Sequence, residues 1–204
     1  MIKPKIKYTE LSSFSNLDDY YRKEFNDNSK DYIELNDIEI NECKFNNINF
    51  SNIKLNKVDI IDCIFTNCDL SNQVFDFRLL ERIEFINCKL VGTSFINSSL
   101  KDLEINSSDM KYSNFSSTKI TNFKVVDSNF QESIFNECEL KKIDLDSDDF
   151  SKSEFINTSL KEIDFSNCKI NNISFDIKSI KGMIINPIDS RELVKILGVK
   201  FKNW

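Results

Sequence analysis

The sequence predicts an all-β solenoid, a chain of short extended segments that turns a corner every five residues. Between residues 35 and 185, every position divisible by five holds a large apolar residue, at 31 of 31 positions, although the chain is only 40% hydrophobic. The residue two before each of them is usually small or β-branched, so the two side chains share one face of a short strand. A period of five matches neither the 3.6 residues of an α-helix nor the two residues of a flat strand.

Residues 1–34 lie outside this register, and we expect them to cap the first coil, because an open solenoid end exposes its core and unpaired strand edges. Ser15 or Asn16 would cap a short helix there, and Asp18 and Asp19 in its first turn would be favoured by the helix dipole. The alternative is a helix that binds a partner. The apolar side of this helix would consist of Leu17, Tyr20, Tyr21 and Phe25.

All six cysteines occupy the small-residue position, two before a five-fold apolar residue. Serine, threonine and isoleucine occupy that position in other units, so we expect the cysteines to be small buried residues rather than disulfides or metal ligands. They are Cys43, Cys63, Cys68, Cys88, Cys138 and Cys168.

Units such as Cys63-Ile-Phe65-Thr-Asn67 and Cys168-Lys-Ile170-Asn-Asn172 resemble the A-(D/N)-L-x-x unit of the pentapeptide-repeat family, and the resemblance covers residues 35–185. It implies a right-handed quadrilateral β-helix with four five-residue faces and 20 residues per coil. Steps of 20 residues support that coil internally, because positions 75 to 175 give an unbroken phenylalanine column and positions 40 to 180 an aliphatic one. Like residues stack when coils lie one strand spacing apart. The expected fold is this β-helix with a short N-terminal cap and a C-terminal helix.

The last part of the chain, residues 186–204, is expected to hold that helix. Asn186-Pro187 breaks the register, Asp189 and Glu192 form a variant of the capping box, and Gly198 ends the helix. The ending over 193–199 resembles the C-terminal helix of the Qnr, MfpA and McbG members of the family, which joins two rods end to end. The resemblance implies a homodimer, with a lid on a single rod as the alternative. The expected interface consists of Leu193, Val194, Ile196, Leu197, Val199, Phe201 and Trp204.

Composition excludes several classes of function. The chain has no histidine, the commonest general base and metal ligand, and its three glycines leave no phosphate-binding loop. Minimal coils leave no cleft that excludes water, so we expect no enzyme activity, cofactor or metal site. No apolar run approaches a membrane span or a signal sequence, which predicts a cytoplasmic protein without membrane contact. The net charge of −6 argues against direct nucleic-acid binding.

The register assigns every outward residue to one face of the rod. The face centred on residues 45, 65, 85 and onward is mainly acidic from residue 84 on, whereas the face centred on 40, 60 and onward is mixed and nearly neutral. Stacked carboxylates about 5 Å apart repel one another, so we interpret the acidic face as a partner-binding surface. Its residues are Glu84, Glu104, Asp127, Asp144, Asp146 and Asp164.

A third face carries apolar residues at outward positions, which is more consistent with contact than with solvent. These residues are Val74, Phe77, Ile96, Ile134, Ile156 and Ile177.

Two functions fit these observations. The resemblance to the Qnr type implies a non-enzymatic DNA mimic, whose acidic surface binds a type II topoisomerase, DNA gyrase or topoisomerase IV, and protects it from quinolones or from a toxin. The alternative is a structural or protein-interaction scaffold without a topoisomerase partner. The C-terminal ending favours the first function, while the modest net charge and the many lysines favour the second.

Overall fold

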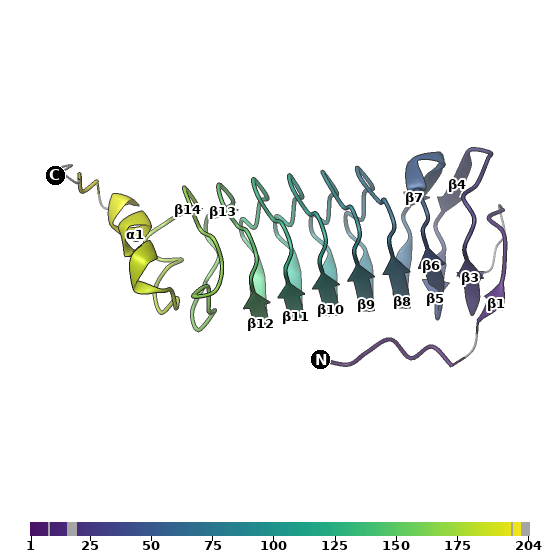
Figure 1. Cartoon of the computed structure of the whole chain (residues 1–204), viewed down its shortest axis with the longest axis horizontal. Coiled ribbons are helices and arrows are strands. Elements are labelled where there is room, and N and C mark those ends of the chain that lie inside the picture. The colour runs from purple at the N-terminus through teal and green to yellow at the C-terminus, as the bar shows by residue number, and fades with distance from the viewer. Residues whose placement is uncertain (8, 16–19, 197, 201–204) are drawn as a thin grey trace.

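The computed structural model describes residues 1–7, 9–15, 20–196 and 198–200. They form a parallel β-solenoid, a rod whose coils stack along its long axis (Figure 1). The strands that precede the long central ones are β1 (Glu10–Leu11), β2 (Tyr20–Tyr21), β3 (Lys23–Phe25), β4 (Ile33–Asn36), β5 (Glu39–Asn41), β6 (Lys44–Asn46) and β7 (Ile53–Asn56), with a 3-10 turn at Phe50–Asn52. The others are β8 (Asp59–Thr66), β9 (Leu79–Ile86), β10 (Ser99–Asn106), β11 (Lys119–Val126), β12 (Glu139–Asp146), β13 (Glu154–Phe155) and β14 (Ser174–Phe175).

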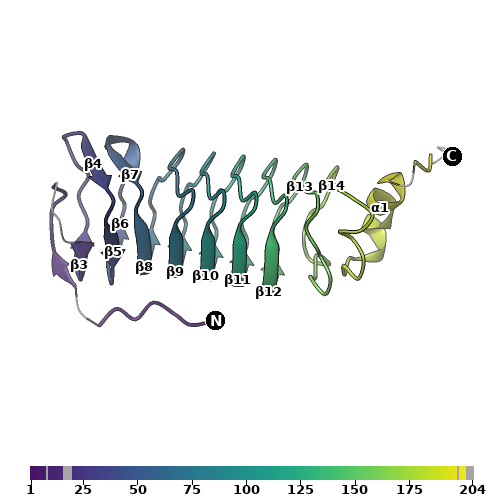
Figure 2. The same cartoon turned by 180° about the vertical axis from the view of Figure 1, so that it is seen from behind.

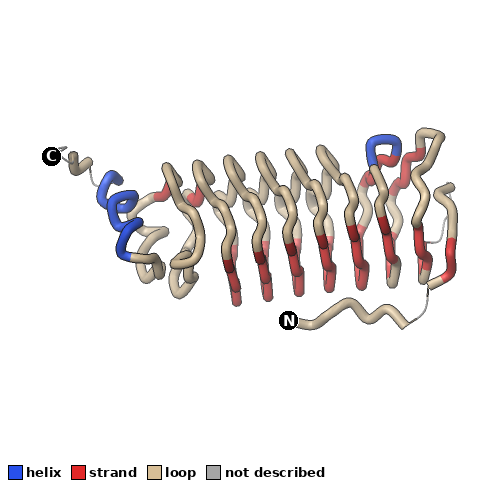
Figure 3. The backbone as a smooth tube through the Cα atoms, in the orientation of Figure 1, coloured by secondary structure: helices blue, strands red, loops and turns tan. Residues whose placement is uncertain are grey.

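The strand pairing confirms the coil of 20 residues. In the main sheet Leu100 pairs with Leu80 on one side and with Ile120 on the other, and every pair in the parallel ladder from β8 to β12 has the same offset. Figure 3 shows the same strand segments repeated in successive coils. Each coil therefore presents its residues directly above those of the coil before it.

We name the four faces of the rod after their central residues. Wall A is centred on residues 45, 65, 85, 105, 125, 145 and 165, and wall B on 50, 70, 90, 110, 130, 150 and 170. Wall C is centred on 75, 95, 115, 135, 155 and 175, and wall D on 40, 60, 80, 100, 120, 140, 160 and 180. The strands β8 to β12 each run through wall D and on into wall A.

Residues in the left-handed backbone conformation make the corners. All non-glycine residues with positive φ have numbers that end in 2 or 7, and their φ values lie between 49° and 65°. Asparagine and aspartate tolerate this conformation better than most side chains, and examples are Asn67, Asn87 and Asp102. One such residue in each unit turns the chain, which explains how a solenoid forms with only three glycines.

The core is a set of stacked columns inside the walls. On wall C, neighbouring phenylalanine rings from Phe75 to Phe155 lie nearly parallel, with centroids 4.5 to 5.5 Å apart. The small-residue positions are buried too, and their polar atoms bond to the backbone: the Thr118 hydroxyl donates to the Phe95 carbonyl, and the Cys138 thiol to that of Phe115. As predicted, all six cysteines are buried. They are thiols without disulfides.

The helix expected in the N-terminal cap is wrong for the residues that the structure describes there. Tyr20 lies in β2 and Phe25 in β3, where they pair with Ile40 and Phe45 one coil further on. Both side chains are buried. Tyr20 and Phe25 already stand at five-fold positions, and stacking on a formed coil stabilises them more than an isolated two-turn helix could. The residues Asn16, Leu17, Asp18 and Asp19 lie outside the described residues.

At the other end of the rod, a 3-10 turn at Pro187–Asp189 leads into the helix α1 (Ser190–Ile196). The Asn186 side chain accepts hydrogen bonds from the backbone N–H groups of Ile188 and Asp189, so Asn186 caps this turn. Figure 2 shows α1 at the end of the rod opposite to β3 and β4.

Candidate partner-binding surfaces

The predicted acidic residues of wall A form a continuous column in the structure. Glu84, Glu104, Lys124 and Asp144 are successive partners in the ladder of β9, β10, β11 and β12. Asp164 occupies the same position one coil later, and Asp127 and Asp146 stand beside the column, toward wall B. Their side chains are therefore held at one coil spacing, about 4.8 Å, by the backbone ladder itself.

The two halves of this column differ in exposure. Glu104 is only 6% exposed, and Glu84 is half-buried. By contrast, the four remaining residues, Asp127, Asp144, Asp146 and Asp164, are all exposed. The acidic surface that faces solvent is therefore the C-terminal half of wall A, and we call these four residues the open acidic patch.

The N-terminal segment neutralises the other half. The Lys3 ammonium lies 3.0 Å from Glu84 Oε1 and also pairs with Glu104. Lys124 Nζ lies 3.5 Å from the other oxygen of Glu104. Burial acts against the charge of Lys3, but its bonds to Glu104 and Glu84 outweigh burial and raise the pKa of Lys3. In the same way burial would raise the pKa of Glu104, but the bonds from Lys3 and Asn106 lower it.

The backbone of that segment is also bound, at the corner between walls D and A. The Ile2 N–H donates to Asp102 Oδ1 and the Lys5 N–H to Asp62 Oδ1, each at 2.8 Å. Asp62 accepts two further bonds of 2.7 Å from the Arg82 guanidinium. Figure 1 shows the segment running alongside the strands, with the N-terminus level with β10. The sequence analysis missed this contact, and the lysines that alternate at 3, 5 and 7 are the signal that points to it.

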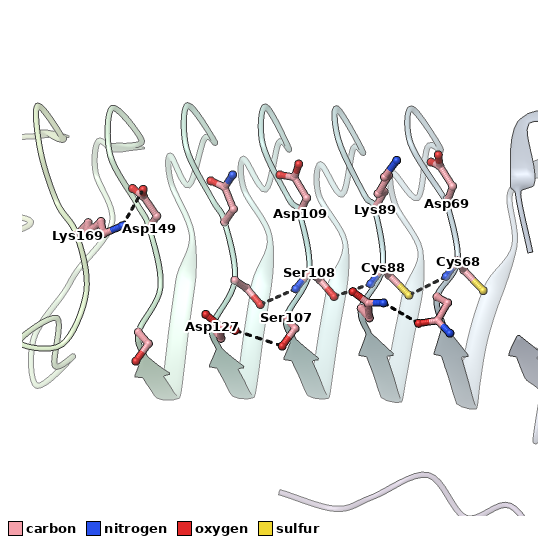
Figure 4. A pocket seen from close by; sticks show the side chains of 15 residues that line it. Cys68, Asp69, Cys88, Lys89, Ser107, Ser108, Asp109, Asp127, Asp149 and Lys169 are labelled. Atoms are coloured by element: carbon pink, nitrogen blue, oxygen red, sulfur yellow. Dashed lines mark hydrogen bonds and ion pairs between the residues drawn. The ribbon is translucent and has the colours of Figure 1, made fainter. Parts of the chain in front are cut away.

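A shallow polar groove follows the corner between walls A and B (Figure 4). On wall B, Asp69, Lys89, Asp109 and Asp149 stand above one another in successive coils, and Lys169 Nζ comes within 4.0 Å of Asp149. Acids and lysines thus alternate along the groove, so its wall B side has no strong net charge. The open acidic patch borders this groove at Asp127, whose carboxylate accepts a bond from the Ser107 hydroxyl.

One carboxylate lies inside the rod. Asp148 occupies the small-residue position that holds Ser108 and Ser128 in the two preceding coils, and it is 1% exposed. Its two oxygens accept the backbone N–H groups of Ser128 and Asp146. Burial, more than these bonds can offset, raises the pKa of Asp148 to about 7. The break in the small-residue pattern at position 148 was visible in the sequence, but its effect depends on burial.

The apolar residues of the third face are only partly exposed. Val74, Phe77 and Ile177 are exposed, whereas Ile96, Ile134 and Ile156 are half-buried. The streak is thus interrupted along the rod.

The expected dimer residues fall at the end that carries α1. Leu193 is half-buried and packs against the core of its own rod, Val194 is half-buried, and Val199 is exposed. Ile196 is the last residue of α1. Leu197, Phe201 and Trp204 lie outside the described residues.

Two further findings concern the described residues alone. They contain no group of three or more side chains placed to hold a metal ion. None of their helices has both the length and the apolar character needed to cross a bilayer.

A family comparison agrees with this architecture. Residues 38–115 and 58–133 match the model described as "Pentapeptide repeat region". The chain belongs to the pentapeptide-repeat family. Members of the family with solved structures resemble it at low identity, while no curated protein sequence matches it. Full-length QnrB1, described as a plasmid-mediated fluoroquinolone resistance protein, is 16% identical with a TM-score of 0.45, over 88% of this chain and 89% of that one. HetL, involved in heterocyst differentiation in Nostoc, is 13% identical with a TM-score of 0.35, over 81% and 88%.

Proposed function

We propose that this pentapeptide-repeat protein is a non-enzymatic DNA mimic that binds a type II topoisomerase, DNA gyrase or topoisomerase IV, through the open acidic patch. The observation that carries the proposal is the placement of Asp127, Asp144, Asp146 and Asp164 on one side of a rigid rod, exposed and fixed at coil spacing. A DNA-binding groove presents lysines and arginines for successive phosphates, and a regular row of carboxylates is complementary to it. The sequence resemblance of the C-terminal ending to the Qnr type identifies the topoisomerase as the partner.

A second function, a protein-interaction scaffold without a topoisomerase partner, is favoured by one observation. Lysines neutralise much of the rod, because Lys3 and Lys124 pair with Glu104, and Lys89 and Lys169 alternate with acids on wall B. Such a surface suits a protein partner with mixed charges better than a DNA groove.

A DNA supercoiling assay separates the two functions. We expect micromolar protein to protect gyrase or topoisomerase IV from a quinolone, or to inhibit supercoiling directly, because the patch would occupy the DNA-binding groove. If both enzymes behave identically with and without the protein, at every quinolone concentration, the protein is a scaffold for another partner.

Charge reversal tests the patch itself. The variant with Asp144→Lys, Asp146→Lys and Asp164→Lys should need at least about tenfold more protein for the same effect, since three attractive charges become repulsive. Glu104 is left unchanged because it holds Lys3. A matched variant carries Glu132→Lys and Glu137→Lys, two exposed acids at the corners that flank wall C, on the opposite side. An equal loss in both variants would show that only the net charge matters.

We also propose that the C-terminal residues from Leu193 onward join two rods into a homodimer. Sedimentation of a chain that ends after Ile188 provides the test, because this truncation removes α1 and the apolar residues that follow it. We expect the full-length chain to sediment as a dimer and the truncated one as a monomer. Dimers of both chains would place the interface elsewhere, and monomers of both would make α1 a lid on its own rod.

A further inference from the structure

The N-terminal segment is attached to the rod by polar contacts alone. Residues 1–7 add nothing to the buried core, and the side chains of Met1 and Ile2 remain about half exposed, at 47% and 51%. The segment is held by two backbone N–H groups and by the Lys3 ammonium. Segments with few buried apolar contacts open at low free-energy cost, so this one can leave without disturbing the coils.

The acceptors for these groups are carboxylates in two adjacent columns. We call Asp62, Glu84, Asp102 and Glu104 the carboxylate track. Asp62 and Asp102 stand two coils apart at the corner between walls D and A, and Glu84 and Glu104 stand on wall A beside them.

The spacing of the track matches an extended peptide. Two coils separate Asp62 from Asp102, which corresponds to about 10 Å, and three residues of an extended chain also span about 10 Å. The two bound N–H groups, those of Ile2 and Lys5, are three residues apart. Lys3 lies between them, and its side chain reaches the second column. The track therefore reads two main-chain N–H groups and one intervening cation.

The carboxylates need such a ligand because they are poorly solvated. Asp62 and Glu104 are each 6% exposed and Asp102 is 1% exposed. Asp102 Oδ1 accepts from Ile2 and from Asn122, whereas Oδ2 is buried and has no hydrogen-bond partner among the described residues. Buried carboxylates without compensating partners are costly, so a segment that brings N–H groups and a cation stabilises this corner.

We propose that the carboxylate track is a binding site for an extended, lysine-bearing peptide segment of a partner protein, which residues 1–7 of the chain itself occupy in the free protein. Any segment with a lysine between two free backbone N–H groups three residues apart can make the same contacts. The segment of the chain itself competes at a high effective concentration because it is covalently linked. The track is thus closed to weak ligands and opens to a partner segment that is abundant or tethered nearby.

A peptide with the sequence of residues 1–8 and a dye at its C-terminus is the probe. The protein is the full-length chain with Lys3→Glu, in which the segment repels the track. Fluorescence anisotropy should show that this variant binds the peptide at least about tenfold more tightly than the unmodified chain does, because the internal competitor has been weakened. Equal binding to both chains, with unchanged thermal melts, would overturn the proposal.

Matched changes locate the site. Adding Glu104→Gln to the Lys3→Glu chain should abolish the gain, whereas adding Glu132→Gln, the same change at an exposed acid paired with Lys152, should not. A peptide that carries Lys3→Glu should not bind. If it binds like the native peptide, the track does not select a cation and the proposal fails.

A measurement on the unmodified chain covers the case in which Lys3→Glu impairs folding. Excess unlabelled peptide should accelerate hydrogen exchange at the Ile2 and Lys5 amides, because the displaced segment loses both bonds. Unchanged exchange at both amides would contradict displacement. None of these measurements contains a topoisomerase, so their outcome is independent of the supercoiling assay.

Discussion

Replacing Phe115 with alanine is expected to lower the free energy of unfolding by about 3 to 5 kcal/mol. The Phe115 ring is 1% exposed, and its centroid lies 4.8 Å from that of Phe95 and 4.5 Å from that of Phe135. Both neighbours are fixed by their own coils, so they cannot close the cavity that alanine leaves. The loss should appear in urea denaturation followed by circular dichroism.

The matched control is Phe77→Ala, the same chemical change at a side chain that is 66% exposed on the neighbouring corner. It should cost less than about 1 kcal/mol, because little apolar surface is lost from the core. A similar loss in both variants, or a loss below about 1 kcal/mol for Phe115→Ala, would contradict the stacked core.

Replacing Asp148 with serine is expected to stabilise the rod at pH 8, on the order of 2 kcal/mol, and to stabilise it much less at pH 4. The pKa of Asp148 is raised to about 7 in the folded state, whereas an aspartate in an unfolded chain titrates near 3.9. The folded state therefore binds the extra proton between these values. Its contribution to stability is fully present below about pH 4 and is lost as pH rises through about 7.

Serine fits the position because the column already contains it. The Ser128 hydroxyl accepts the Ser108 N–H and donates to the Val126 carbonyl, and a serine at 148 can accept the Ser128 N–H in the same way. Asp146 and Asp127 also face this carboxyl and help to raise its pKa. Thermal unfolding at pH 4 and pH 8 measures the effect, with Asp144→Ser on the exposed surface of the same coil as the control. A stability difference that does not change with pH would refute a buried titrating Asp148.

The repeat could be predicted from the sequence because a single rule applies to every coil. Each five-fold residue points inward and each coil pairs with the next at a fixed offset, so local pattern and long-range contact coincide. The first coil shows where this reasoning stopped too early. Lys30 interrupts the five-fold series, yet Tyr20 and Phe25 continue it, and they pair with Ile40 and Phe45.

The candidate surface could be predicted only in part. The register placed the acidic residues on wall A, but it gives no information on what covers them. The contacts of Ile2 with Asp102 and of Lys5 with Asp62 join residues 100 and 57 positions apart. They involve backbone donors and follow no periodicity, so no sequence pattern encodes them. The raised pKa of Asp148 likewise depends on a buried environment rather than on its neighbours in sequence.

The constant 20-residue offset between coils has a consequence for how such a chain can change length during evolution. Inserting or deleting a whole coil leaves every remaining residue on its own wall and moves the two ends of the rod apart or together by about 4.8 Å. Inserting a single five-residue unit instead turns everything beyond it by one wall, which would carry Asp144 and Asp164 to a different side from Glu84. Length is thus free to vary in whole coils, whereas the alignment of distant charges permits no smaller step.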